Sequence, residues 1–183
     1  MISLIILGII FLYAIISYNT LTRKRNNVDN AFGSIDVMLK KRFDLIPNLV
    51  ATVQQYAKHE EETFTKITNL RTKIYDSLTA EEKADFDKTF TAAKNNFFMV
   101  AETYPALRSS ENFMQLQKTL NETEEQLSAS RRTYNAAVTD YNNSVMTFPS
   151  NIIANLFNFT KKEVFAIPEE EKVNPDVKKL FRS

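Results

Sequence analysis

Only two glycines, Gly8 and Gly33, occur in the 183 residues of this chain, against an average usage of about 7%. Tight β-hairpins depend on residues that tolerate positive φ angles, glycine above all. A chain this poor in glycine is a poor candidate for a β-sandwich or a β-barrel. It also lacks any glycine-rich loop that could hold a phosphate group. We therefore expect an all-α protein.

Side chains that ligate metals or act as nucleophiles are scarce. There is no cysteine, and His59 is the single histidine, which excludes a disulfide, a thiolate nucleophile and a site with several histidines from one chain. Lys and Arg number 23 and Asp and Glu number 22, for a net charge of +1. That balance gives no electrostatic reason to expect nucleic-acid binding. We predict no cofactor, no metal and no enzymatic activity.

The charged residues are distributed unevenly, since none lies before Arg23. Ile2–Tyr18 is a continuous apolar run that spans about 26 Å as a helix at ~1.5 Å per residue. This length is near the lower limit for crossing a hydrocarbon core of about 30 Å. A cleaved signal peptide is the alternative, but no basic residue precedes the run and no good small-x-small cleavage site follows it. We predict a transmembrane anchor over residues 1–19, which contacts membrane lipid.

Three basic residues, Arg23, Lys24 and Arg25, flank the predicted anchor. Basic residues beside a membrane span tend to remain in the cytoplasm. We therefore predict that the N-terminus lies outside and the following domain in the cytoplasm, with the domain outside as the alternative. Each of these charges would also favour anionic headgroups by roughly 1 kcal/mol.

The segment after the anchor has the spacing of an amphipathic helix. With Arg25 and Arg42 filling two of the positions, the spacing over residues 20–42 alternates between three and four, which predicts a helix continuous with the anchor. Its stripe is Leu21, Val28, Phe32, Ile35 and Leu39. Pro47 then predicts a break, because proline disfavours the helical conformation of the preceding residue and suits the first turn of a new helix. We expect a connection near residues 44–47 and a second helix over about Pro47–Ser77.

Capping signals divide the remainder of the chain. Thr79 and Glu82 have the T-x-x-E spacing of a capping box, which predicts a third helix ending near Tyr104. A fourth helix, capped by Ser109 or Ser110, carries the clearest signal, with 3–4 spacing over about five heptads. Its stripe is Phe113, Leu116, Leu120, Thr123, Leu127, Ser130, Tyr134, Ala137 or Val138, Tyr141, Val145 and Phe148.

Pro149 is predicted to end the fourth helix or to begin a short apolar helix over residues 150–157. Short connections place neighbouring helices antiparallel. We predict an antiparallel bundle of long helices, of the four-helix type, over residues 20–159. A transmembrane helix continuous with the first bundle helix precedes it. The charged residues 160–183 form a tail that lies on the bundle or is partly disordered.

His59 and the three glutamates after it are the strongest candidate for a metal site. The zinc-protease motif needs a second histidine four residues on, where this chain has Thr63. A weak carboxylate–histidine site and the solvated face of a helix both remain as interpretations, and we favour the second. Acidic pairs elsewhere suggest a di-iron bundle, but that site needs more than one histidine.

A Tyr-Asn pair occurs twice, as Tyr134-Asn135 and as Tyr141-Asn142. The spacing of seven residues places both pairs on one face of a helix. One interpretation is a polar docking stripe, and the other is a seam in which asparagine fixes the register against a neighbouring helix. We favour the seam.

Polar side chains also cluster around the first predicted connection. Arg42 is expected to pair with Asp36 or with a glutamate of another helix, and Asp44 is positioned to cap the second helix. No nucleophile, base and orienting group are found together here.

Several longer motifs run through almost the whole chain. They are Tyr18-Asn19, Arg25-Asn26-x-Val28-x-Asn30-Ala31-Phe32, Ile35-Asp36-Val37-x-Leu39-Lys40-x-Arg42-Phe43-Asp44-Leu45-Ile46-Pro47-Asn48-Leu49-Val50, Tyr56-Ala57-x-His59-Glu60, Tyr104-Pro105-x-Leu107, Asn112-Phe113-x-x-Leu116-Gln117, Thr123-Glu124, Arg131-x-x-Tyr134-Asn135, Tyr141-Asn142 and Phe148-Pro149-Ser150-Asn151-Ile152-Ile153-Ala154. Together they resemble the LemA family of bacterial proteins. The chain departs from the family at Phe32, where a tryptophan is usual, and near Asn158, where a glycine is usual.

The resemblance implies an antiparallel bundle of long helices behind an N-terminal segment in the bacterial cell membrane, and it implies no reaction or cofactor. We therefore predict an interaction or scaffold module of the bacterial envelope, with a protein partner or self-association. A lipid-binding or membrane-organising protein is the alternative. Candidate partner-contact residues are Arg42, Asp44, His59, Glu60 and Arg131.

Overall fold

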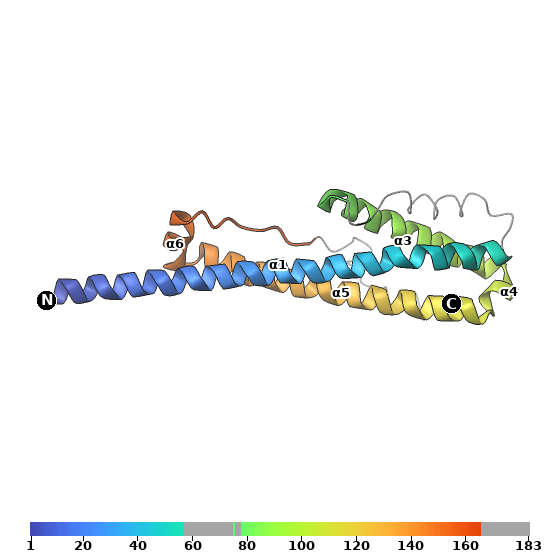
Figure 1. The fold of residues 1–183 in the computed structure, drawn as a ribbon, viewed down its shortest axis with the longest axis horizontal. Coiled ribbons are helices and arrows are strands. Elements are labelled where there is room, and N and C mark those ends of the chain that lie inside the picture. Colours follow the sequence, from blue (N-terminus) through green and yellow to red (C-terminus); the bar gives the residue numbers. More distant parts are fainter. Residues whose placement is uncertain (57–74, 76–77, 166–183) are drawn as a thin grey trace, which may run out of the picture. The chain divides into compact units, whose positions relative to one another are not determined.

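The computed structural model describes residues 1–56, 75 and 78–165 of the chain. This part of the chain is helical and contains no strand, which confirms the all-α prediction. Its helices, labelled in Figure 1, are α1 (Ile2–Tyr56), α3 (Ala80–Thr103), α4 (Pro105–Arg108), α5 (Glu111–Met146) and α6 (Ser150–Leu156).

The chain divides into two compact units. Unit 1 comprises Met1–Asp29 and Thr133–Ser183, and unit 2 comprises Asn30–Arg132. Helices α1 and α5 each contribute one segment to each unit. The core of unit 1 is formed by Leu21, Val28, Val138, Tyr141, Val145, Ile153, Ala154 and Phe159. The sequence predicts a different division, into a membrane anchor up to residue 19, a bundle up to residue 159 and a tail. That division stays a prediction.

In unit 2, α1, α3 and α5 lie side by side (Figure 1). Arg42 of α1 reaches Glu124 of α5, whereas Thr52, later in α1, lies in the same hollow as Asn112, earlier in α5. These two helices are therefore antiparallel, as the sequence predicts.

Helix α3 runs antiparallel to α5 and parallel to α1. Phe97 packs on Phe113 of α5 with ring centroids 5.5 Å apart, while Asp87, earlier in α3, reaches Arg131, later in α5. Phe86, Phe90, Ala93 and Ala101 are also buried on α3.

Helix α1 continues through Pro47, so the predicted connection near residues 44–47 and a helix beginning at Pro47 are wrong. Proline has no N–H, so the Phe43 carbonyl loses its intrahelical hydrogen bond, at a cost of about 3 kcal/mol. Ile46 and Leu49, on either side, are almost completely buried. Burial of such side chains contributes about 1.5–3 kcal/mol each, which offsets the cost. Residues 57–74 and 76–77 of the predicted second helix lie outside the described residues.

The buried face of α1 differs from the predicted stripe at one place. Leu21, Val28, Ile35 and Leu39 are buried as predicted, but Phe32 is exposed and Ala31 is buried instead. The buried residue after Val28 is thus three positions on, at Ala31, rather than four positions on, at Phe32. The next buried residue is Ile35, so the buried face still follows a helix of 3.6 residues per turn.

The predicted helix starts after residue 78 are confirmed. The Thr79 hydroxyl accepts from the Glu82 N–H at 3.2 Å, and the Glu82 carboxylate accepts from the Thr79 N–H at 2.9 Å, which completes a capping box. Ser110 Oγ accepts from the Phe113 N–H at 3.2 Å, so Ser110 caps α5. The short apolar helix after Pro149 is α6.

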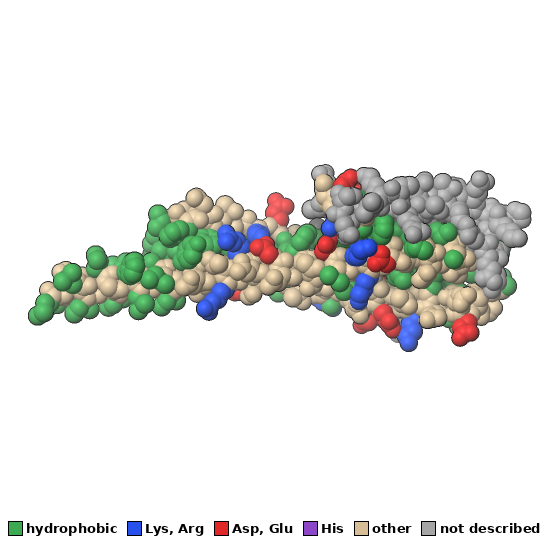
Figure 2. All heavy atoms as spheres, in the orientation of Figure 1, with side chains coloured by type: hydrophobic (Ala, Val, Ile, Leu, Met, Phe, Trp, Pro, Cys, Tyr) green, Lys and Arg blue, Asp and Glu red, His purple; other side chains and the backbone are tan. Residues whose placement is uncertain are grey.

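The N-terminal part of α1 has the length and composition of a membrane-spanning helix. Within the described residues, one helix, Ile2–Thr52, contains an 18-residue stretch that is sufficiently apolar, with mean hydropathy 2.2. Only 6% of that stretch is buried, whereas a soluble core helix would be mostly buried. Figure 2 shows the apolar side chains exposed along this end of α1. A signal sequence meets the same criteria of length and composition.

Candidate functional site

The three predicted membrane-flanking residues lie on α1 within unit 1 and differ in their surroundings. Arg23 is exposed. Lys24 forms an ion pair with Asp140 of α5, with Nζ and Oδ1 2.7 Å apart. The Arg25 guanidinium lies over the Phe159 ring, 5.2 Å from its centroid. The basic cluster is thus partly used to hold α5 and the residues after α6 against α1.

A charge network occupies the interior of unit 2. The Arg42 side chain is 2% exposed and donates through Nη1 to Asp87 and through Nη2 to Glu124. The second oxygen of Asp87 accepts from Arg131, and Lys94 Nζ lies 3.4 Å from Glu124 Oε1. Three cations thus surround two carboxylates. Since a buried charge is stable only when it is paired and hydrogen-bonded, this network fixes how α1, α3 and α5 pack.

The network settles the predicted partners of Arg42. Of the two alternatives, pairing with a glutamate of another helix is confirmed by Glu124. Asp36 is used elsewhere, because its Oδ1 accepts from the Tyr75 hydroxyl at 2.9 Å and from Lys83 Nζ at 2.7 Å.

Of the candidate partner-contact residues, the structure brings Arg42 and Arg131 together on the Asp87 carboxylate. Arg42 and Arg131 bond inward, so the buried Arg42 has no surface to offer a partner in this conformation. Asp44 is exposed and pairs with Lys40 at 3.0 Å; it lies inside α1, so the prediction that it caps a helix is wrong. His59 and Glu60 lie outside the described residues. Partner contact stays a prediction.

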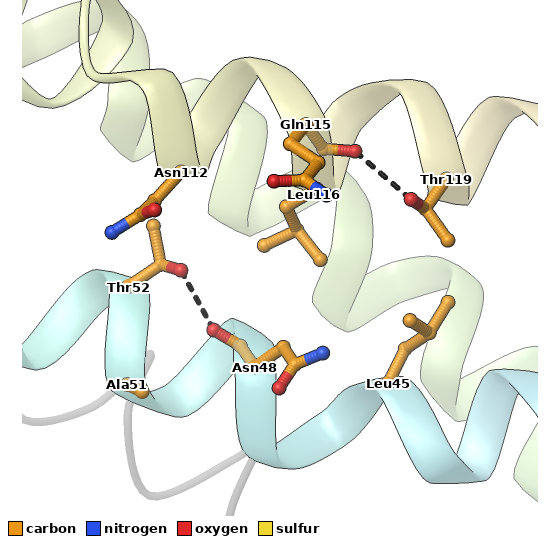
Figure 3. Close-up of a pocket in the computed structure, with 8 residues that line it drawn as sticks. All are labelled: Leu45, Asn48, Ala51, Thr52, Asn112, Gln115, Leu116 and Thr119. Carbon is orange, nitrogen blue, oxygen red and sulfur yellow. Dashed lines mark hydrogen bonds between the residues drawn. The ribbon is translucent and has the colours of Figure 1, made fainter.

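A polar hollow of about 360 Å³ lies between α1 and α5 in unit 2. Asn48, Thr52, Asn112, Gln115 and Thr119 supply its polar lining, and Figure 3 shows these side chains projecting from the two helices into the space between them. Both threonine hydroxyls bond to carbonyls of their own helices, Thr52 to Asn48 at 2.7 Å and Thr119 to Gln115 at 3.0 Å. The hollow therefore offers amide groups rather than charges. It was missed by the sequence analysis, because no local spacing links residues 48 and 115.

The Tyr-Asn repeat of α5 binds the chain after α6. The Asn142 amide donates to the Lys162 carbonyl at 2.8 Å and accepts from the Lys162 N–H at 2.9 Å. Asn135 repeats this pattern with Phe165, at 3.0 Å and 2.7 Å. Each asparagine side chain thus donates one hydrogen bond to the backbone of a single residue and accepts one from it, as the backbone of a neighbouring β-strand would.

The two tyrosines complete the same arrangement. The Tyr141 hydroxyl donates to the Thr160 carbonyl at 2.9 Å, and the Tyr134 hydroxyl donates to the Glu163 carbonyl at 3.1 Å. Burial is the largest effect on both phenols and raises the pKa of Tyr134 and of Tyr141 above the usual value.

The spacing of these contacts follows from the two chain conformations. Seven residues of helix advance about 10.5 Å at ~1.5 Å per residue, and three residues of extended chain advance about 10 Å at ~3.3 Å per residue. Side chains seven residues apart on α5 are therefore spaced to meet backbone groups three residues apart in the segment 160–165. The predicted seam exists, but its partner is an extended segment rather than a helix. The first part of the predicted tail thus lies on α5.

Among residues 1–56, 75 and 78–165, no group of three or more histidine, cysteine, aspartate or glutamate side chains could hold a metal ion. The paired charges of unit 2 are bonded to one another, and the hollow presents amides and hydroxyls.

The LemA family model matches residues 31–178, which is most of the chain. The chain belongs to the LemA family. This member is 27% identical over 179 residues to Protein LemA of Metamycoplasma hominis, covering 95% of this chain and 80% of that protein. The matched region includes the charge network, the polar hollow and the Tyr-Asn repeat.

Two other relatives of this LemA family member come from Paramagnetospirillum magneticum. The magnetosome proteins MamQ 1 and MamQ 2 are each 23% identical to it over 174 residues. The alignments cover 81% of this chain and 64% of each relative, so the chain spans less than two thirds of their length.

Proposed function

We propose that this chain is a single-pass membrane protein of the bacterial envelope whose helical bundle acts as an interaction module. The observation that carries the proposal is the N-terminal part of α1, which is free of charged side chains and exposed, and which continues as the same helix into the bundle. A helix with apolar side chains on all faces needs an apolar environment. A bilayer supplies one along the whole of Ile2–Tyr18.

The polar hollow between α1 and α5 is the proposed contact surface for a protein partner. Asn48 and Gln115 present side-chain amides there, and amides both donate and accept. Asp44, one turn before Asn48 on α1, adds an exposed carboxylate beside the hollow. His59 and Glu60 remain proposed contacts on sequence grounds.

Site-specific photo-crosslinking in cells tests this proposal. A crosslinking amino acid at Asn48 and, separately, at Gln115 is expected to capture the same partner, identified by mass spectrometry. Position 99 is the control, since Met99 is exposed and lies on α3. With the crosslinking amino acid at position 44, the double variant Asn48→Ala/Gln115→Ala should no longer capture the partner. Its midpoint of thermal unfolding should not fall. Equal capture by that variant would contradict the proposed surface.

The proposed orientation has its own test, which uses the absence of cysteine from the chain. A membrane-impermeant maleimide should label Ile2→Cys in intact cells and leave Met99→Cys unlabelled, since the basic residues are expected to stay in the cytoplasm. The opposite labelling would place the bundle outside. Recovery of a chain that lacks the apolar segment would identify a cleaved signal peptide.

A membrane-organising role is the second candidate, because exposed Arg23 and Arg25 follow the apolar segment directly. A chain without residues 1–19 should then bind vesicles containing phosphatidylglycerol, and high salt should weaken the binding. Equal binding by Arg23→Gln/Arg25→Gln would contradict this role.

A further inference from the structure

A second charge-free segment of unit 1 exposes large apolar side chains. Residues 146–160 contain no Asp, Glu, Lys or Arg. Phe148 is 74% exposed, Ile152 56%, Leu156 69% and Phe157 52%. The prediction that Phe148 continues the buried stripe of α5 is wrong, because α5 ends at Met146. Large apolar side chains that are exposed within one short stretch of chain point to a binding site.

Helix α6 is apolar on two opposite sides. Ile152 and Leu156 are four residues apart and share one face, whereas Ala154, on the opposite face, is fully buried. Ile153 is buried beside it in the core of unit 1. The structure of unit 1 thus uses one side of α6 and leaves the other available.

The buried side of α6 packs on the last turns of the apolar segment of α1. Ala14 packs against the core that contains Ile153 and Ala154. The Tyr18 ring meets the Phe157 ring edge-on, with centroids 4.8 Å apart. Helix α6 therefore lies beside the point where α1 leaves the proposed membrane, with its other side exposed. In Figure 2, apolar side chains gather where Figure 1 places α6, beside the N-terminal part of α1.

The apolar part of α1 and the segment 146–160 are both uncharged, and each is followed by cationic residues. These cationic residues lie near one another in unit 1. On α1 the first charged residues are Arg23, Lys24 and Arg25, and after α6 they are Lys161 and Lys162. The two series meet, because the Arg25 guanidinium lies over the Phe159 ring and Lys162 pairs with Asp29. Apolar side chains followed by tyrosines and cations mark the change from acyl chains to headgroups at a membrane surface.

We propose that residues 146–160 form a second membrane contact, in which Phe148, Ile152, Leu156 and Phe157 insert into the leaflet from which α1 emerges. The partner is the lipid surface at the boundary of headgroups and acyl chains, where short apolar elements bind in the plane of the membrane. This inference rests on the proposed membrane anchoring of α1. It extends that function because unit 1 is then held to the bilayer at two points rather than one.

Depth-dependent fluorescence quenching tests the contact in the full chain. Ile152→Cys and Leu156→Cys would each carry an environment-sensitive dye, in vesicles of phosphatidylcholine and phosphatidylglycerol. Ile9→Cys serves as the anchor control and Lys118→Cys, on the exposed face of α5 in unit 2, as the solvent control. Lipids brominated near the headgroup end should quench the α6 dyes about threefold or more above the Lys118 dye.

The outcomes separate the inference from the anchoring on which it rests. Quenching at Ile9 with no quenching at Ile152 or Leu156 would overturn the second contact and leave the anchor intact. An unquenched Ile9 dye would overturn both. A second copy of the chain could instead cover this face. In that case brominated lipid would not quench the dye at Ile152→Cys, and the unlabelled Ile152→Cys protein would form a disulfide between two copies. This result would overturn the lipid contact.

A second set of variants tests the same contact without a dye on α6. With the dye at Phe148→Cys, Ile152→Ser/Leu156→Ser should at least halve the quenching, because the neighbouring apolar anchors are removed. Met99→Ser/Met114→Ser is the matched control, since both methionines are exposed in unit 2. Equal quenching in the two backgrounds would contradict the inference.

Discussion

Asn142 and Lys162, twenty residues apart, form a reciprocal pair of hydrogen bonds of 2.8 Å and 2.9 Å between a side-chain amide and a backbone. Asn135 and Phe165 form the same pair one heptad earlier on α5. Because these bonds use only the backbone of residues 160–165, they hold that segment independently of its side chains. Asparagine is needed because it both donates and accepts.

Removing both asparagine amides should release this segment. Asn135→Ala/Asn142→Ala deletes four hydrogen bonds, each worth about 1 kcal/mol, so the Lys162 and Phe165 amides should exchange hydrogen much faster. Asn143→Ala is the control, because Asn143 is exposed and adjacent. Unchanged exchange at the Lys162 amide would contradict the role of the repeat.

High pH should release the same segment through the tyrosines. The neutral phenols donate to carbonyls, and burial raises the pKa of Tyr134 and Tyr141. Their contribution is therefore complete below the usual pKa of about 10 and is lost as the pH rises through the raised values. Absorbance of phenolate at 295 nm should show a late-titrating fraction in the folded protein. Tyr134→Phe/Tyr141→Phe should lack that fraction, and its persistence would assign it to other tyrosines.

Loss of Asp87 should strongly destabilise unit 2. Asp87→Ala leaves Arg42 and Arg131 facing one another without their shared carboxylate, and breaking a buried pair costs about 3–5 kcal/mol. Asp85→Ala, at an exposed site two residues earlier, should stay within about 0.5 kcal/mol of wild type. Urea unfolding of the two variants measures the difference. Equal midpoints would show that the network adds no stability.

Replacing Gly33 should stabilise α1. Glycine in a helix interior is less favourable than alanine by about 0.8–1.0 kcal/mol, and a Cβ at this position meets nothing within 4 Å. Gly33→Ala should therefore raise the free energy of unfolding by about 1 kcal/mol, as a higher urea midpoint at unchanged slope. Ser34→Ala is the adjacent control and should have a smaller effect. A lower midpoint for Gly33→Ala would mean that this site needs glycine.

Several features could be predicted from the sequence because their causes are local. The capping box at Thr79, the Ser110 cap and the short helix after Pro149 depend on neighbouring residues, and each was placed correctly. The break at Pro47 was predicted wrongly for the same reason. Proline acts locally, but burial of Ile46 and Leu49 against distant helices outweighs its cost.

The candidate site shows the same difference between features with local causes and features that depend on distant residues. The sequence identified Arg42 and the Tyr-Asn repeat as polar residues that need partners, yet it could not identify Asp87 or the backbone of Lys162. Those partners lie 45 and 20 residues away, and no local spacing connects them. The polar hollow had no local signal at all, since it exists only where α1 passes α5.

The sequence by itself determined that the described part of this chain is helical, where α3, α5 and α6 begin, and that an apolar, charge-free segment precedes them. These properties follow from periodicity, caps and composition, which act within a few turns. Tertiary structure alone decided which charges are buried, what the Tyr-Asn repeat holds and which face of α6 remains exposed. These depend on contacts between segments far apart in the chain, because burial and pairing are properties of the packed helices together.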